Sequence, residues 1–280
     1  MTDGVDLANA ERRIATRGAL ERVTGRLSRS IADAIDAARV SSEPFHHLVL
    51  DRVFPDQVYA AMLRAMPDAS DYRPMHGRSK ENDLADGTHT RLKIDLFAEY
   101  AWHLPAEKRG VWNLASAALR SREVKRAFIR KLAPGLKRRF GDRYASLPMY
   151  PVPVLTRDIA GYLIRPHTDT RWKAITVQLY LPPDNAAVHA GTIFHERRPD
   201  GVVVKHTQMR FAPNTGYAFA VDETTWHSVD QVGPEVKARD SILLAYFVDD
   251  GPVRMLRNRG KRLGNFLLNE FRFWTGIGSP

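Results

Sequence analysis

The spacing of apolar residues predicts a chain whose first half is mainly helical. Between residues 7 and 40, apolar positions recur at three- and four-residue steps, which is typical of one face of an amphipathic helix. A second helix is expected over 55–66, and a mainly helical stretch over 105–140 is expected to be interrupted at Pro134-Gly135. The apolar positions of the first helix are Leu20, Val23, Leu27, Ile31, Ile35 and Ala38.

Strand signals dominate from residue 147 to about residue 248. Short runs rich in β-branched and aromatic residues alternate there with turn signals such as Asn214-Thr215-Gly216. Many short strands separated by turns favour a jelly roll or a barrel. Two further short strands are expected earlier, at 45–50 and 92–97. The expected strands of the second half cover 175–181, 191–194, 202–205, 217–221 and 241–248.

Three potential metal ligands stand out within this strand-rich half. His167 and Asp169 lie two residues apart, and residues i and i+2 of a strand point to the same face, so both can aim at one metal. His227 is the best candidate for a third ligand. Two histidines and one carboxylate form the facial triad of non-haem Fe(II) oxygenases. A His-x-Asp pair alone often arises by chance, so it indicates a metal site only together with further residues of the expected kind.

A basic residue and a hydroxyl further along the chain support the metal site. Arg239 follows His227 by twelve residues, Ser241 comes two residues later, and an apolar run continues to Val248. A guanidinium can bind a carboxylate through two hydrogen bonds, and a serine hydroxyl can add a third. The alternative for Arg239 is a surface ion pair with Asp240 or Glu235.

In order and spacing, these residues resemble the Fe(II)/2-oxoglutarate-dependent dioxygenases over roughly residues 150–250. The resemblance implies a mainly β fold with flanking helices: a double-stranded β-helix, the cupin-like jelly roll, preceded by an N-terminal helical region. It also implies Fe(II) held by His167, Asp169 and His227, with Arg239 and Ser241 binding the co-substrate 2-oxoglutarate, and O2 as the second co-substrate.

Further residues of the expected site follow from the same resemblance. Prolyl-hydroxylase-like enzymes use a tyrosine in a Tyr-Leu phrase to bind 2-oxoglutarate, which points to Tyr180, although a buried strand tyrosine is an equal alternative. Thr176 and Gln178 share its face by the period of two and could line the same pocket. Lys173 and Arg165 lie close to the ligand strand and could contact an anionic substrate or only solvent; contact with solvent is slightly favoured. The implied reaction hydroxylates an unactivated C–H bond and releases succinate and CO2, while desaturation and epoxidation use the same ligands.

Composition narrows the setting of this chemistry. The 280 residues contain no cysteine, which excludes a disulfide framework and a thiolate metal site. The sequence has no apolar run of about 18 residues and no apolar segment near Met1. We therefore expect neither a membrane-spanning helix nor a secretory signal. We expect a cytoplasmic location.

The formal net charge of +10 comes from two segments, 120–140 and 251–280, whose net charges of +8 and +5 together exceed that of the whole chain. Such segments can hold anions, although a solvated helix face is the more common reason for them. We expect a small-molecule substrate that carries a carboxylate or a phosphate, and we do not expect nucleic acid as the ligand. Peripheral membrane contact and a homo-oligomer stay open.

The chain is expected to form one integrated domain with four segments. These are an N-terminal helical extension (1–43), a helical support region (44–146), the double-stranded β-helix core (147–250) and a basic, aromatic C-terminal segment (251–280). Two other functions compete with the oxygenase: a cupin-like metalloenzyme that is not an oxygenase, and a basic binding module on a β-helix scaffold.

Overall fold

The computed structural model describes residues 4–75 and 83–248, together with Gly260, Gly264, Leu267, Glu270 and Phe271. Most of the basic C-terminal segment therefore lies outside the described residues. Glu270, a described residue of that segment, contacts the body of the protein through a buried, bidentate ion pair with Arg73.

The described strands form two antiparallel sheets. The larger has eight strands in the order β1-β2-β10-β7-β12-β5-β4-β3, and the smaller has four in the order β6-β11-β8-β9. The strands are β1 (Arg39–Ser41), β2 (His47–Leu50), β3 (Arg73–Pro74), β4 (Arg91–Asp95), β5 (Met149–Asp158), β6 (Ile164–His167), β7 (Lys173–Tyr180), β8 (Ile193–Arg197), β9 (Val203–Gln208), β10 (Gly216–Ala220), β11 (His227–Val229) and β12 (Arg239–Val248).

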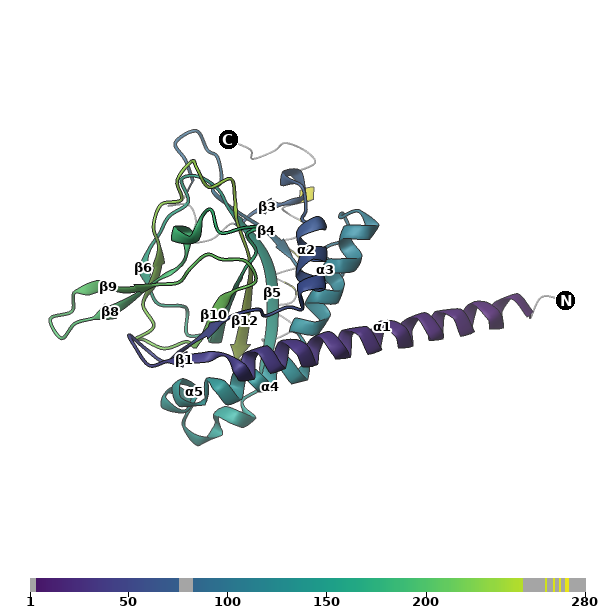
Figure 1. Cartoon of the computed structure of the whole chain (residues 1–280), viewed down its shortest axis with the longest axis horizontal. Coiled ribbons are helices and arrows are strands. Elements are labelled where there is room, and N and C mark those ends of the chain that lie inside the picture. Colours follow the sequence, from purple (N-terminus) through teal and green to yellow (C-terminus); the bar gives the residue numbers. More distant parts are fainter. Residues whose placement is uncertain are drawn as a thin grey trace.

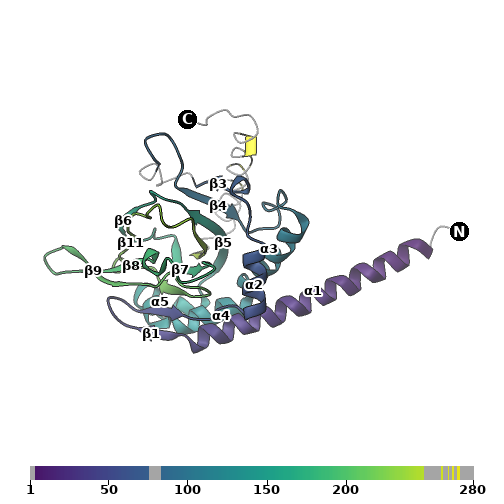
Figure 2. The same ribbon diagram turned by 45° about the horizontal axis from the view of Figure 1, so that its top comes forward.

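The eight strands from β5 to β12 follow the path of a jelly roll. The chain passes from the large sheet (β5) to the small sheet (β6), returns to the large sheet (β7), and crosses again to the β8–β9 hairpin of the small sheet. β10 and β12 then join the large sheet, while β11 between them joins the small one (Figures 1 and 2). This winding confirms the predicted double-stranded β-helix.

Helices from the first half of the chain pack on the outer face of the large sheet. They are α1 (Gly4–Ala37), α2 (Asp56–Arg64), α3 (Ala106–Leu119), α4 (Arg122–Lys131) and α5 (Ala133–Phe140), with short 3-10 turns at Ala69–Asp71, Gly141–Ser146 and Val188–Ala190. The C-terminal part of α1 lies against this layer, and its N-terminal part extends beyond the body of the protein (Figures 1 and 2). Among the helices that the structure describes, none is both long and apolar enough to cross a bilayer.

Two details of the helical half differ from expectation. The stretch 105–140 does not break at Pro134-Gly135; Pro134 lies in the first turn of α5, where its missing N–H needs no partner. The breaks fall at Leu132 and before Ser121, whose hydroxyl accepts a hydrogen bond from the Val124 N–H and so caps α4. The first helix ends at Ala37 rather than residue 40, and the residues after it form the edge strand β1.

The large sheet separates two apolar cores. The first core lies between the large sheet and the helices and includes Ile31, Trp112 and Phe128. The other fills the space between the two sheets and is rich in aromatic side chains, among them Phe194 and Phe219. Several residues of this second core also line a cavity between the two sheets.

Candidate metal centre and its pocket

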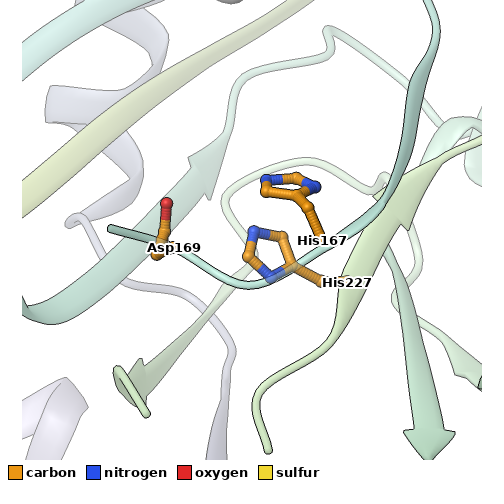
Figure 3. Close-up of side chains that lie close together, drawn as sticks. All are labelled: His167, Asp169 and His227. Carbon is orange, nitrogen blue, oxygen red and sulfur yellow. The ribbon is translucent and has the colours of Figure 1, made fainter. Parts of the chain in front are cut away.

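His167, Asp169 and His227 come together between the two sheets. His167 ends β6 and His227 begins β11, and the register of these antiparallel strands makes them direct partners, with ring centroids 4.3 Å apart. Each of the three residues offers one ligand atom, and these atoms all lie within 4.8 Å of one another (Figure 3). Within the described part of the chain, this is the one such group of histidine and acidic side chains.

The i, i+2 spacing predicted that His167 and Asp169 lie on one strand. They do not, because β6 ends at His167. The aspartate lies in the loop that follows, and two residues of β7 hold its carboxylate. Lys173 Nζ donates to Oδ1 at 2.6 Å and Thr176 Oγ1 donates to Oδ2 at 2.5 Å. Lys173 therefore faces the site rather than solvent, which corrects the sequence-based expectation.

Backbone carbonyls fix the tautomer of both imidazoles. Nδ1 of His167 lies 2.9 Å from the Arg165 carbonyl oxygen, and Nδ1 of His227 lies 3.0 Å from that of Thr225. Because a carbonyl oxygen can only accept, each Nδ1 carries the proton and donates it. Each Nε2 is then left with the lone pair that a metal needs, as in metal-binding histidines generally.

The electrostatics of the three side chains also suit a cation. Burial lowers the pKa of His227 to about 4, although the nearby Asp169 carboxylate opposes this, so its imidazole is neutral near pH 7. Burial by itself would raise the pKa of Asp169, but the Lys173 ammonium and the His227 side chain outweigh burial, and the pKa falls well below its usual range. Two imidazoles and one carboxylate are the donor set of the non-haem Fe(II) facial triad, so the residues fit that metal.

The three residues line a cavity of about 250 Å³. Of the other residues expected in the site, Arg239, Thr176 and Gln178 also line it, whereas Tyr180 and Ser241 lie behind its wall. The cavity is lined by Met75, Arg91, Tyr162, Ile164, His167, Asp169, Thr170, Lys173, Thr176, Gln178, Thr192, Tyr217, His227, Val229, Arg239 and Leu243.

Arg239 is held in place by the strand register. It lies directly opposite Asp158 across the β12–β5 pair, and its Nη1 donates to Asp158 Oδ2 at 2.7 Å. Its Nε donates to the Ala190 carbonyl at 2.6 Å and its Nη2 to Thr192 Oγ1 at 3.1 Å. The side chain is 1% exposed, and its ion pair is with buried Asp158 rather than with Asp240 or Glu235. Since a guanidinium has five N–H donors, one N–H on each of Nη1 and Nη2 remains for a ligand.

Tyr180 and Ser241 support this arrangement from behind. The Tyr180 hydroxyl donates to Thr192 Oγ1 at 3.0 Å, and the Tyr180 ring lies 5.4 Å below the Arg239 guanidinium. The Ser241 hydroxyl accepts a hydrogen bond from the Gln178 side chain. Neither group lines the cavity itself, so direct contact of these residues with a co-substrate stays a prediction.

The structure adds wall residues that the sequence did not single out. Arg91, Tyr162, Thr192 and Tyr217 line the cavity, and Asp158 lies between two of its arginines. None of them stands in a recognisable motif. Tyr162 had one usable signal, since it immediately follows Gly161, whose φ of +92° makes the turn that leads into β6.

No protein-family model and no curated protein matches the chain. Several solved structures are similar to it in fold. A prolyl hydroxylase from Trichoplax adhaerens, in complex with a hypoxia inducible factor oxygen degradation domain peptide fragment, is 13% identical, with 82% of this chain and 92% of that chain covered and a TM-score of 0.47. A Pseudomonas putida prolyl-4-hydroxylase is 15% identical (78% and 99% covered, TM-score 0.45). An oxidoreductase of the 2OG-Fe(II) oxygenase family from Burkholderia pseudomallei is 16% identical (73% and 85% covered, TM-score 0.43). At such identities and TM-scores, these likenesses say nothing about what this chain binds or converts.

Proposed function

We propose that this chain is an Fe(II)- and 2-oxoglutarate-dependent oxygenase that hydroxylates a C–H bond of a small substrate. The observation that carries the proposal is the shared cavity: the two histidines and the aspartate line the same small pocket as Arg239. Arg239 is a buried cation, and two of its N–H groups remain for a ligand. A metal triad serves many chemistries, but a buried guanidinium beside it provides for an anionic co-substrate.

His167, Asp169 and His227 would hold the iron, and the triad leaves three coordination positions for other ligands. The bound metal, with O2 and 2-oxoglutarate, would supply the oxidising power for C–H hydroxylation, with succinate and CO2 as co-products. The protein's own part is to position these groups. Lys173 and Thr176 orient the Asp169 carboxylate, and two backbone carbonyls keep both imidazoles in the tautomer that can bind a metal.

Arg239 would bind the carboxylate of 2-oxoglutarate that lies away from the metal. The remaining N–H groups of Nη1 and Nη2 suit a bidentate carboxylate contact, which is stronger and more directional than a single hydrogen bond. The burial of Arg239 adds to this, because a charge pair inside the protein is weakly screened by water. Thr192 and Gln178 offer neutral polar groups along the same wall.

Two half-buried basic residues of the segment 120–140, Lys131 and Arg139, hold helices in place, which counts against a role for these two cations in a basic binding module. Lys131 Nζ donates to the carbonyl oxygens of Asp36 and Ala38 at the end of α1, each at 2.9 Å. Arg139 Nη1 donates to the carbonyls of Lys173 and Val221, and so ties α5 to the large sheet. These cations are occupied in holding helices to the body of the protein.

Succinate formation tests the proposal. Purified protein would be freed of metal, reloaded anaerobically with Fe(II), and supplied with O2 and 2-oxoglutarate together with a pool of small metabolites. We expect succinate release that needs Fe(II) and is absent in His167→Ala, Asp169→Ala and His227→Ala, each of which also binds iron more weakly. His195→Ala is the matched control, because that buried histidine bonds to Ser228 and does not line the cavity.

The other outcomes identify the rival functions. Tight metal binding at the triad without consumption of 2-oxoglutarate would indicate a cupin-like metalloenzyme of another kind. A protein that binds no metal at all would leave only a binding module.

A further inference from the structure

A second arginine of the cavity, Arg91, has no part in the chemistry described so far. It lies on β4, in the register position directly opposite Asp158, on the other side of β5 from Arg239. The three side chains Arg91, Asp158 and Arg239 therefore form a row across three adjacent strands. Arg91 Nε lies 3.2 Å from Asp158 Oδ1, while Arg239 contacts Oδ2.

One carboxylate cannot neutralise two guanidiniums. Within the described part of the chain, Asp158 is the carboxylate paired with either arginine, and it is completely buried between them. Arg91 Nε is itself buried and makes no hydrogen bond of good geometry with a described residue. The row therefore has a surplus positive charge, and Arg91 brings that surplus to the cavity wall.

Tyr162 completes the donor set around Arg91. Its hydroxyl accepts a hydrogen bond from Arg91 Nη1, and its ring lies 4.9 Å below the guanidinium. Burial raises the pKa of Tyr162 to about 12, although Arg91 opposes this, so the phenol keeps its proton at neutral pH. That proton has no acceptor among the described residues, and it is available to a ligand that already contacts Arg91.

The charge of the cavity leaves room for one more anion. Arg91, Lys173 and Arg239 are three cations, and Asp158 and Asp169 are two carboxylates, so the group as a whole carries one positive charge. A ferrous ion would add two positive charges and the 2-oxoglutarate dianion would cancel them. One positive charge then remains, and an anionic group of the substrate would neutralise it.

From this row we propose that Arg91 and Tyr162 form a second anion site, which binds an acidic group, a carboxylate or a phosphate, of the substrate that is hydroxylated. The inference rests on the proposed oxygenase function and names its substrate class. Neighbouring strands are about 4.8 Å apart, so the backbones of Arg91 and Arg239 are roughly 10 Å apart with Asp158 between them. The carboxylate of Asp158 already fills the position between the two guanidiniums, so a ligand carboxylate cannot take the same position, and each arginine addresses an anion of its own.

The test uses benzoate, phenyl phosphate and neutral benzamide as probes of one shape. Dissociation constants would be measured by saturation-transfer NMR on the protein loaded with Mn(II) and saturated with 2-oxoglutarate, and on the metal-free protein. Enhanced relaxation of the probe protons by Mn(II) reports that the probe lies in the same cavity as the metal. We expect at least one of the two anions to bind and to be relaxed, without displacing 2-oxoglutarate, and benzamide to bind much more weakly.

Variants separate the two arginines. Arg91→Gln and the milder Tyr162→Phe should weaken the bound anion, the former by at least about tenfold because a hydrogen-bonded charge is lost. Both should keep 2-oxoglutarate affinity within about threefold of wild type. Arg239→Gln should do the reverse. Arg198→Gln, at an exposed arginine between β8 and β9 that does not line the cavity, is the control and should change neither constant.

Three results would overturn the second site: anion binding that survives Arg91→Gln, an anion that competes with 2-oxoglutarate, or loss of 2-oxoglutarate rather than of the probe in Arg91→Gln. Failure of the wild-type protein to bind 2-oxoglutarate would instead contradict the proposed function. In that case the Arg91 site is judged on the metal-free titration alone.

Discussion

Asp158→Asn replaces the shared carboxylate of the arginine row by a neutral amide of nearly the same shape. Asp158 is fully buried, and its two ion-pair distances to Arg239 and Arg91 are 2.7 and 3.2 Å. Removing one partner of a buried ion pair costs about 3–5 kcal/mol, because the remaining charge stays buried without compensation. Here two guanidiniums lose their shared partner, so we expect the free energy of unfolding to fall by at least the lower end of that range, about 3 kcal/mol.

Urea unfolding followed by circular dichroism measures this loss. Asp36→Asn is the matched control: Asp36 also pairs with an arginine, Arg130, but this pair is largely exposed, with 41% and 56% of the side chains accessible. An exposed pair contributes about 0–1 kcal/mol, so the control should unfold almost as the wild type does.

Ligand addition sharpens the same experiment. Once Asp158 is neutral, bound 2-oxoglutarate becomes the main anionic partner of the Arg239 guanidinium, so saturating 2-oxoglutarate with Mn(II) should stabilise Asp158→Asn more than the wild type. The gap between the two proteins should therefore narrow. A loss below about 1 kcal/mol, as in an exposed pair, or a gap that the ligand leaves unchanged, would refute the idea that Asp158 balances two cations at the cavity wall.

Three further predictions follow from individual contacts. Arg239→Gln should weaken 2-oxoglutarate binding by roughly a hundredfold or more, since a buried charge pair loses one partner; calorimetry that finds an unchanged dissociation constant would exclude Arg239 as the co-substrate residue. Lys173→Met should tighten Fe(II) binding by about tenfold, because the ammonium lies 2.6 Å from Asp169 and repels a cation there, while Thr176 still orients the carboxylate; competition with a chromophoric chelator measures this, and equal or weaker binding would contradict it. Gly216→Ala should destabilise the protein by about 1–3 kcal/mol or more, because its Cβ would lie 2.2 Å from a backbone oxygen of β7, whereas Gly110→Ala, with open space around it, should stabilise α3 by about 0.5–1 kcal/mol in thermal or urea unfolding.

The parts of the fold that the sequence predicted are those with a strong local pattern. β7 alternates apolar and polar residues over most of its 8 residues, and β12 ends its 10 residues in a continuous apolar run, so both strands are recognisable without a partner. β6 and β11 have only 4 and 3 residues, and their pairing depends on the other sheet. Local periodicity cannot detect strands that short, and these two strands carry both histidines.

The pocket residues, too, were predictable where the signal is local in the sequence and not where it depends on strand pairing. His167, Asp169 and His227 were identifiable because their chemical types recur at a recognisable spacing, and the structure brings them together. Arg91 was not identifiable, because it reaches the cavity only through the register of β4 against β5, two strands that lie more than fifty residues apart in the chain. The partner of Arg239 was missed for the same reason, since cross-strand register is a property of the assembled sheet.

Anomalous diffraction at the iron absorption edge tests the central claim most directly, on crystals grown anaerobically with Fe(II) and 2-oxoglutarate. We predict one iron peak per chain among His167, Asp169 and His227, with 2-oxoglutarate in the same cavity and one of its carboxylates against Arg239. A peak at another place, an absent peak, or a 2-oxoglutarate carboxylate bound away from Arg239 would contradict this account.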